Sequence, residues 1–143
     1  MAATTRSANA HWEGSLMEGA GSVSLESSRV GTFDVTWASR AESPDGRTSP
    51  EELIAAAHST CFSMALSHGL AGAGTPPQAI DTSADVDFVP GTGITEIRLT
   101  VRGKVDGLSN DDFVAAAEDA KKNCPVSQAL TGTTITLDAA LTE

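Results

Sequence analysis

Several features that are common in proteins of this size are scarce in the sequence. Tyr is absent, and aromatic residues make up only 4% of the 143 residues. A core must therefore be filled mostly by Ala, Val, Ile, Leu and a few Phe. Basic residues are also few, 9 against 19 acidic ones, which gives a net charge of −10. Because nucleic acid and anionic membrane surfaces need basic patches, we predict neither as a partner.

Long apolar runs are missing as well. No stretch approaches about 18 consecutive apolar residues, so we expect no membrane span. Residues 1–10 are small and polar and lack the apolar segment of a signal peptide, which predicts a cytoplasmic location. Hydrophobic residues nevertheless reach 40%, and neither a repeat nor a linker interrupts the chain. We therefore predict one domain, 1–143.

Cysteine is limited to Cys61 and Cys124. Two thiols are too few for a four-thiolate zinc site, and cytoplasmic thiols are normally kept reduced. The count leaves two interpretations open. The cysteines form a redox-cycling pair, or they are two inert thiols of the kind that cores often contain.

Hydrophobic patterning predicts an α+β fold with mostly antiparallel strands. Short segments separated by Gly and Ser predict an antiparallel meander at the start of the chain, and two later segments alternate strictly between apolar and polar residues. The predicted strands are 10–13, 21–25, 33–38, 80–88, 94–105 and 133–141. The predicted helices are 49–68 and 109–123, and residues 39–49 are predicted to form a loop.

The first predicted helix has a clear start. Ser49 is the predicted N-cap, Pro50 occupies the first helical position, and Glu52 completes an S-x-x-E capping box. Residues 53–66 carry no charged side chain, which is typical of a buried helix. In a chain this small, such a helix needs cover on every side. Its own sheet and a partner subunit could supply that cover.

Cys61 lies in the middle of this helix. Apolar surroundings raise a thiol pKa, and the helix N-terminus is about 18 Å away, too far for its dipole to help. A nucleophilic Cys61 would therefore need a cation. His58 lies one turn earlier, and Arg40 and Arg47 belong to the predicted loop. Arginine is favoured because it stays charged and its planar fork can contact a thiolate and a peroxide oxygen together.

A carboxylate could hold that arginine, and Glu51 and Glu52 at the head of the helix are the candidates. Glu51 precedes Cys61 by ten residues, which is about 15 Å along a helix with the side chains roughly 80° apart. One straight helix cannot bring them together. If both serve one site, a second chain must contribute, and we therefore hypothesise a homodimer.

The surroundings of Cys124 favour a different assignment. Pro125 can open a short helical turn, and Lys121 and Lys122 lie close in sequence. Taken alone, these features favour Cys124 as the thiol with the lower pKa, although it could also be a small capping residue. His58 likewise has two interpretations, a proton shuttle or a hydrogen-bonded core histidine.

Two longer motifs resemble a known family. S-P-E-E-L-I-A-A-A-H-S-T-C-F-S-M-A-L (49–66) and N-C-P-V-S-Q-A-L (123–130) are similar to the signature of the OsmC/Ohr family, the osmotically inducible and organic hydroperoxide resistance proteins, and closest to its OsmC branch. A-H-W-E-G (10–14), I-D-T-S-A-D-V (80–86) and I-T-L-D (135–138) follow the family's order and spacing. The resemblance covers essentially the whole chain.

The resemblance implies an intertwined homodimer in which antiparallel sheets surround central buried helices, with active sites between subunits. It also implies a thiol peroxidase for organic hydroperoxides and, less well, hydrogen peroxide. By motif position, Cys61 matches the peroxidatic cysteine, Cys124 the resolving cysteine, and Glu51 the glutamate that holds Arg40. The family's aromatic residue after that arginine is missing here, so Arg47 stays the alternative.

The expected cycle runs through a Cys61 sulfenate and a Cys61–Cys124 disulfide, which a dithiol, by resemblance a lipoyl group, then reduces. It needs no metal, flavin or haem. Two rival hypotheses remain. One is a zinc-binding or regulatory module that uses both cysteines and His58, and the other is a small-molecule-binding stress protein with incidental cysteines.

Overall fold

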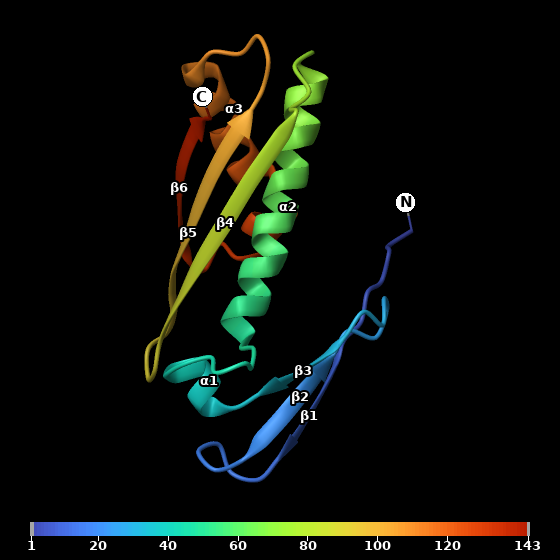
Figure 1. Ribbon diagram of the computed structural model, residues 1–143, viewed down its shortest axis with the longest axis vertical. Helices are drawn as coiled ribbons and strands as arrows, with labels where there is room; N and C mark the ends of the chain where they lie inside the picture. Colours follow the sequence, from blue (N-terminus) through green and yellow to red (C-terminus); the bar gives the residue numbers. More distant parts are fainter. Residues whose placement is uncertain (1, 143) are drawn as a thin grey trace. The chain divides into compact units, whose positions relative to one another are not determined.

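The computed structural model describes residues 2–142, which form two compact units, one up to Leu53 and the other from Ile54 onward. The mixture of helices and strands confirms the predicted α+β class (Figure 1). The elements are β1 (Asn9–Glu13), β2 (Ala20–Ser24), β3 (Thr32–Val35), α1 (Trp37–Ala41), α2 (Pro50–Gly72), β4 (Ala79–Val89), β5 (Gly93–Lys104), α3 (Asn110–Asn123), α4 (Pro125–Ala129) and β6 (Thr134–Leu141).

The first unit contains the predicted antiparallel meander, with the strands in the order β1-β2-β3. Trp12 on β1 lies opposite Gly21 on β2. A Cβ atom at Gly21 would collide with the carbonyl oxygen of His11 and with the Trp12 ring. Glycine is therefore required where this ring lies across the sheet.

The predictions of a strand over 33–38 and of a loop over 39–49 are wrong where the two segments meet. Strand β3 ends at Val35, and the short helix α1 follows. The Ser39 N–H donates to the Thr36 hydroxyl at 3.0 Å, and the Thr36 N–H donates to the Ser39 hydroxyl at 3.0 Å. This reciprocal capping box outweighs the strand-like pattern of the segment. It places Arg40 on a helix.

Helix α2 begins where the sequence predicts. The Ser49 hydroxyl accepts a hydrogen bond from the Glu52 N–H at 3.1 Å. The return bond of a capping box is replaced, because the Glu52 carboxylate instead accepts from the Thr48 hydroxyl at 2.6 Å. The prediction of a helix start is confirmed, with a different partner for the glutamate.

Helix α2 runs past the predicted end near His68, as far as Gly72. Glycine weakens a helix by only about 1 kcal/mol relative to alanine. Leu70 is 2% exposed and belongs to the core. Its burial explains why the helix continues through Gly69.

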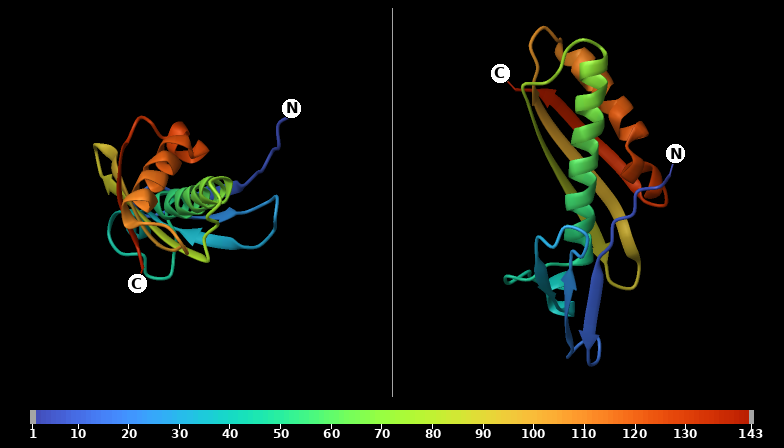
Figure 2. Two further views of the ribbon diagram at one scale, coloured as in Figure 1. Left: turned by 90° about the horizontal axis from the view of Figure 1, so that it is seen from above. Right: turned by 90° about the vertical axis from the view of Figure 1, so that its right-hand side faces the viewer.

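The second unit is a three-stranded sheet in the order β4-β5-β6, with α2 and α3 on the same face (Figure 2). Strands β4 and β5 are antiparallel, whereas β5 and β6 are parallel. The parallel pair requires a crossover connection, which α3 and α4 provide. Ile97, Leu99 and Val101 on the central strand point toward the helices and are completely or almost completely buried.

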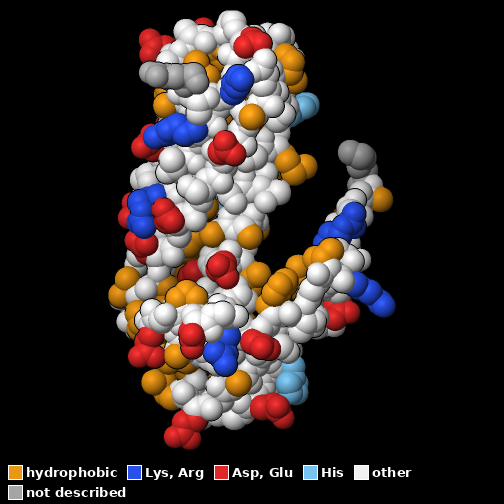
Figure 3. Space-filling view, in the orientation of Figure 1, with side chains coloured by type: hydrophobic (Ala, Val, Ile, Leu, Met, Phe, Trp, Pro, Cys, Tyr) orange, Lys and Arg blue, Asp and Glu red, His pale blue; other side chains and the backbone are white. Residues whose placement is uncertain are grey.

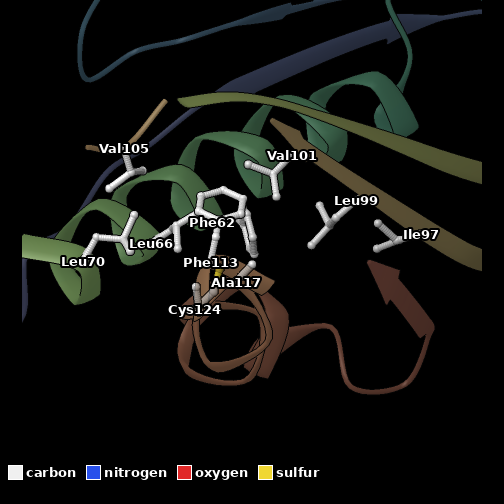
Figure 4. Packing of buried hydrophobic residues seen from close by; sticks show 11 residues of the cluster. Phe62, Leu66, Leu70, Ile97, Leu99, Val101, Val105, Phe113, Ala117 and Cys124 are labelled. Atoms are coloured by element: carbon white, nitrogen blue, oxygen red, sulfur yellow. The ribbon is translucent and has the colours of Figure 1, made fainter. Parts of the chain in front are cut away.

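The core lies between this sheet and its two helices. Figure 4 shows Phe62 and Leu66 of α2 directed toward Phe113 of α3, with Cys124 at the edge of the same cluster. A Cβ atom at Gly103 of β5 would collide with the Phe113 ring. The ring therefore packs directly on the backbone of the central strand.

The acidic and basic side chains are interspersed over the face that Figure 3 shows. This mixture fits a solvated surface. Within residues 2–142, no helix combines the length and the apolar character that crossing a membrane demands.

Candidate active site

The second unit brings the two cysteines together. Cys61 comes from the middle of α2, and Cys124 forms the junction between α3 and α4. Both are free thiols, and they are hydrogen-bonded to each other. The two sulfur atoms are thus close enough for chemistry between them.

The two thiols differ in access. Cys124 is 0% exposed, whereas Cys61 is part-exposed and opens into a groove of about 1020 Å³. The sheet covers α2 on one side only, so the face that carries Cys61 is part-exposed in the single chain. The groove is lined mainly by small apolar side chains of α2 and α3, among them Ala57, Ala65, Ala116 and Ala120.

Electrostatics favour the thiolate on Cys124. Burial raises the pKa of this thiol, but hydrogen bonds from the Ser127 and Val126 N–H groups, the Ser127 hydroxyl and the Cys61 thiol outweigh it, so the pKa lies below its ordinary value. The pKa of Cys61 is raised, first by burial and then by its interaction with Cys124, against one hydrogen bond from the Val126 N–H. Shifts in these two directions are those expected when the Cys61 S–H donates to the Cys124 sulfur.

His58 joins the same cluster from α2. Its ring is 0% exposed, and Nε2 is hydrogen-bonded to the Ser127 hydroxyl at 2.7 Å. Nδ1 is buried and has no hydrogen-bond partner among residues 2–142. Burial lowers the pKa of His58, so the ring is neutral. We call Cys61, Cys124, Ser127 and His58 the thiol cluster.

Ser127 is a site residue that the sequence analysis missed. Its hydroxyl is buried between Cys124 and His58. A signal for it exists in the sequence, because Pro125 opens α4 with Cys124 as N-cap. Ser127 then occupies the third helical position, where a side chain can reach back toward the cap.

The first unit holds the predicted arginine and glutamate as an ion pair. Nε of Arg40 lies 3.0 and 3.2 Å from the two carboxylate oxygens of Glu51, and Nη2 lies 2.9 Å from one of them. Glu51 is 6% exposed. Two parallel N–H···O bonds of this kind fix the plane of the guanidinium.

Arg47, the alternative arginine, is placed differently. Its Nη1 lies 3.4 Å from the carbonyl oxygen and 3.9 Å from the carboxylate of Asp45. Glu51 therefore holds Arg40 and not Arg47.

A small apolar pocket lies beside Arg40. It has a volume of about 340 Å³, and Trp12, Leu16, Trp37 and Pro50 line it together with the arginine. The guanidinium is thus next to a space that suits an apolar group.

Known proteins are similar to this chain in sequence. A family model described as "OsmC-like protein" matches residues 43–138. A protein of Escherichia coli (strain K12) named "Peroxiredoxin OsmC" is 46% identical over 132 residues, which cover 90% of this chain and 91% of that protein. A protein of the same name from Shigella flexneri matches to the same extent. The chain belongs to the OsmC family. At this identity, membership of the OsmC family confirms the predicted class of enzyme, a thiol-dependent peroxidase.

Solved structures confirm the OsmC/Ohr fold. An organic hydroperoxide resistance protein OsmC from Legionella pneumophila is similar with a TM-score of 0.75 and 24% identity, covering 98% of this chain and 99% of that one. An organic hydroperoxide resistance protein from Elizabethkingia anophelis has a TM-score of 0.75 and 23% identity, covering 99% of each chain.

Proposed function

We propose that this protein reduces organic hydroperoxides, and hydrogen peroxide less well, through a Cys61 sulfenic acid and a Cys61–Cys124 disulfide. The observation that carries the proposal is the pair of touching thiols, one open and one enclosed. A peroxide can reach Cys61 from the groove, whereas Cys124 exposes no surface. Access therefore makes Cys61 the attacking thiol, although the local electrostatics favour a thiolate on Cys124.

Arg40 supplies the charge that Cys61 lacks. The guanidinium stabilises the Cys61 thiolate and the oxyanion that develops as the O–O bond breaks, while Glu51 fixes its orientation. The sulfur attacks the distal peroxide oxygen, the O–O bond breaks, and the alcohol leaves. Cys61 is oxidised to a sulfenic acid, and the peroxide is reduced.

Cys124 then resolves the sulfenic acid. Its sulfur attacks the Cys61 sulfur, the S–O bond breaks, and water leaves as the disulfide forms. A dithiol of the lipoyl type reduces this disulfide by exchange and returns both thiols. We assign the reaction to the cytoplasm, where such dithiols are kept reduced.

The active enzyme is proposed to be a homodimer in which Arg40 and Glu51 of one subunit serve Cys61 of the other. The ten-residue spacing of Glu51 and Cys61 along one helix supports this arrangement. A second argument comes from the groove at Cys61, which Met64 also lines with 68% of its surface exposed, so that a partner subunit bordering this groove would bring its Arg40 to Cys61 and leave an entrance for the peroxide. An apolar helix face of this kind is typical of an interface.

An organic substrate suits the pocket beside Arg40. An alkyl group can lie against Trp12 and Trp37 while the peroxide oxygens face the guanidinium. Hydrogen peroxide has no apolar group to bury, so it gains none of this binding free energy.

A turnover assay tests the proposal. Cumene hydroperoxide and hydrogen peroxide are compared as substrates, with dihydrolipoamide and thioredoxin as reductants. We expect the fastest turnover with cumene hydroperoxide and dihydrolipoamide. Cys61→Ser should reduce the turnover number at least ~10³-fold, because the nucleophile is lost. Cys124→Ser should accumulate the sulfenic acid, which dimedone traps. Undiminished turnover by Cys61→Ser would contradict the proposal.

A further inference from the structure

Resolution of the sulfenic acid requires a group that accepts the proton of the Cys124 thiol. Once Cys61 is a sulfenic acid, it no longer donates an S–H to Cys124, and any proton on the Cys124 sulfur must leave as the disulfide forms, yet Cys124 is 0% exposed. Water cannot reach this sulfur to accept the proton. An acceptor must therefore belong to the protein and touch Cys124.

Ser127 and His58 occupy that position. The Ser127 hydroxyl is hydrogen-bonded to the Cys124 sulfur on one side and to Nε2 of His58, at 2.7 Å, on the other. The three side chains form one chain of hydrogen bonds, and none of them is more than 5% exposed. Each link joins a group that can donate to a group that can accept.

The direction of these bonds can reverse without movement of heavy atoms. In the thiol state, S–H donates to the serine oxygen and O–H donates to Nε2. In the thiolate state, Nε2–H donates to the serine oxygen and O–H donates to sulfur. The other ring nitrogen usually fixes the tautomer through its own hydrogen bond. In His58, Nδ1 has no such partner within residues 2–142, so either direction is open.

We propose that His58 and Ser127 act as a proton relay for Cys124 during disulfide formation, an inference that rests on the function proposed above. The Cys124 S–H bond breaks, its proton moves to Ser127, and the serine proton moves to Nε2 of His58. The S–S bond forms, the S–O bond of the Cys61 sulfenic acid breaks, and His58 gives its extra proton to the departing hydroxide, which leaves as water. One proton leaves Cys124 and one water leaves the site, so the step balances.

Two features make His58 a temporary carrier of the proton. Burial lowers its pKa, so the imidazolium releases the proton readily. His58 also precedes Cys61 by three residues on α2, which places both side chains on one face of the helix. This spacing is short enough for the relay to end at the oxygen that leaves Cys61, which is where the proton must go for the step to balance.

A purely structural role of His58 would change the rates of the two chemical steps in a different way. A histidine that only fills the core usually has both ring nitrogens hydrogen-bonded. Loss of a structural bond would lower the stability of the protein and slow both chemical steps together. Loss of a relay would slow disulfide formation much more than formation of the sulfenic acid.

The test follows the two steps separately in the full-length reduced protein. One equivalent of cumene hydroperoxide is added, and samples are quenched with acid and a thiol-blocking reagent. Mass spectrometry then measures the dimedone-trapped sulfenic acid and the disulfide. We expect Ser127→Ala and His58→Gln to slow disulfide formation at least ~10-fold, as expected for loss of a general base. Formation of the sulfenic acid should be slowed much less than disulfide formation in both variants.

Two further variants serve as controls. Ser127→Thr keeps a hydroxyl and should restore disulfide formation to near the wild-type rate. Ser63→Ala removes a hydroxyl of the same helix, which is hydrogen-bonded to Thr82 at 2.7 Å and lies away from the thiols. It should change neither step.

Wild-type disulfide formation in both Ser127→Ala and His58→Gln would overturn the relay, as would a Ser127→Thr protein as slow as Ser127→Ala. Should Ser127→Ala fail to fold, the rate of disulfide formation in His58→Gln alone tests the relay. A wild-type protein that forms neither a Cys61 sulfenic acid nor the disulfide would overturn the proposed function itself. The two failures are thus distinguishable.

Discussion

The Arg40–Glu51 ion pair and the thiol cluster are stabilised in different ways. The ion pair consists of two full charges in bidentate contact, and the Arg40 side chain keeps 30% of its surface exposed. The thiol cluster is largely buried, and packing and hydrogen bonds between formally neutral side chains hold it. Packing positions the sulfur atoms well, but burial opposes the charge that the Cys61 nucleophile needs. The second unit thus holds two thiols whose charge burial opposes, and the first unit holds a permanently charged arginine in a fixed orientation.

The largest effect should follow removal of that cation. Arg40→Met should slow oxidation of Cys61 by cumene hydroperoxide about 10²–10³-fold, the usual result of losing one preorganised oxyanion donor. Arg47→Met is the matched control, because Arg47 is paired with Asp45 and forms no ion pair with Glu51 within residues 2–142. Rapid-mixing kinetics measure both variants. An equal loss of oxidation rate in the two variants would show that the rate depends on net charge and not on the Arg40–Glu51 ion pair.

The dependence of the thiol cluster on packing can be tested at Gly103. Gly103→Ala places a methyl group against the Phe113 ring, and overpacking of this kind costs about 1–3 kcal/mol of unfolding free energy. Phe113 belongs to α3, which leads directly to Cys124. Gly132→Ala is the control, since a Cβ atom there meets no atom within 4 Å. Urea unfolding measures both, and an unchanged midpoint for Gly103→Ala would contradict the tight packing.

The smallest expected effect is a difference in the pH at which each thiol ionises. In an Arg40→Met background, Cys61→Ser keeps only Cys124, whose pKa is lowered, and Cys124→Ser keeps only Cys61, whose pKa is raised. As the pH rises, the protein that retains Cys124 should therefore form its thiolate first. Thiolate absorbance at 240 nm follows both titrations. The reverse order would show that the cluster does not favour charge on Cys124.

The sequence determined the local features of this protein. Ser49 caps α2 as predicted, and Ser109 caps α3 at the predicted start of the second long helix, because a cap involves residues within three positions of each other. The alternation of Ile97, Leu99 and Val101 identified the buried face of β5. The two cysteine motifs identified the family. The contact between Arg40 and Glu51 was expected from the resemblance and not from spacing.

Only the tertiary structure decided which thiol is open and which is enclosed. Apolar neighbours along the helix suggested that Cys61 is buried, but exposure depends on what packs against each face, and the sheet leaves that face uncovered. The partnership of His58 with Ser127 spans 69 residues, and the parallel pairing of β5 with β6 spans a helical crossover. Sequence periodicity reports the geometry of one element at a time. Contacts between elements depend on the packing of the whole unit, and here that packing assigned the cysteines their different access.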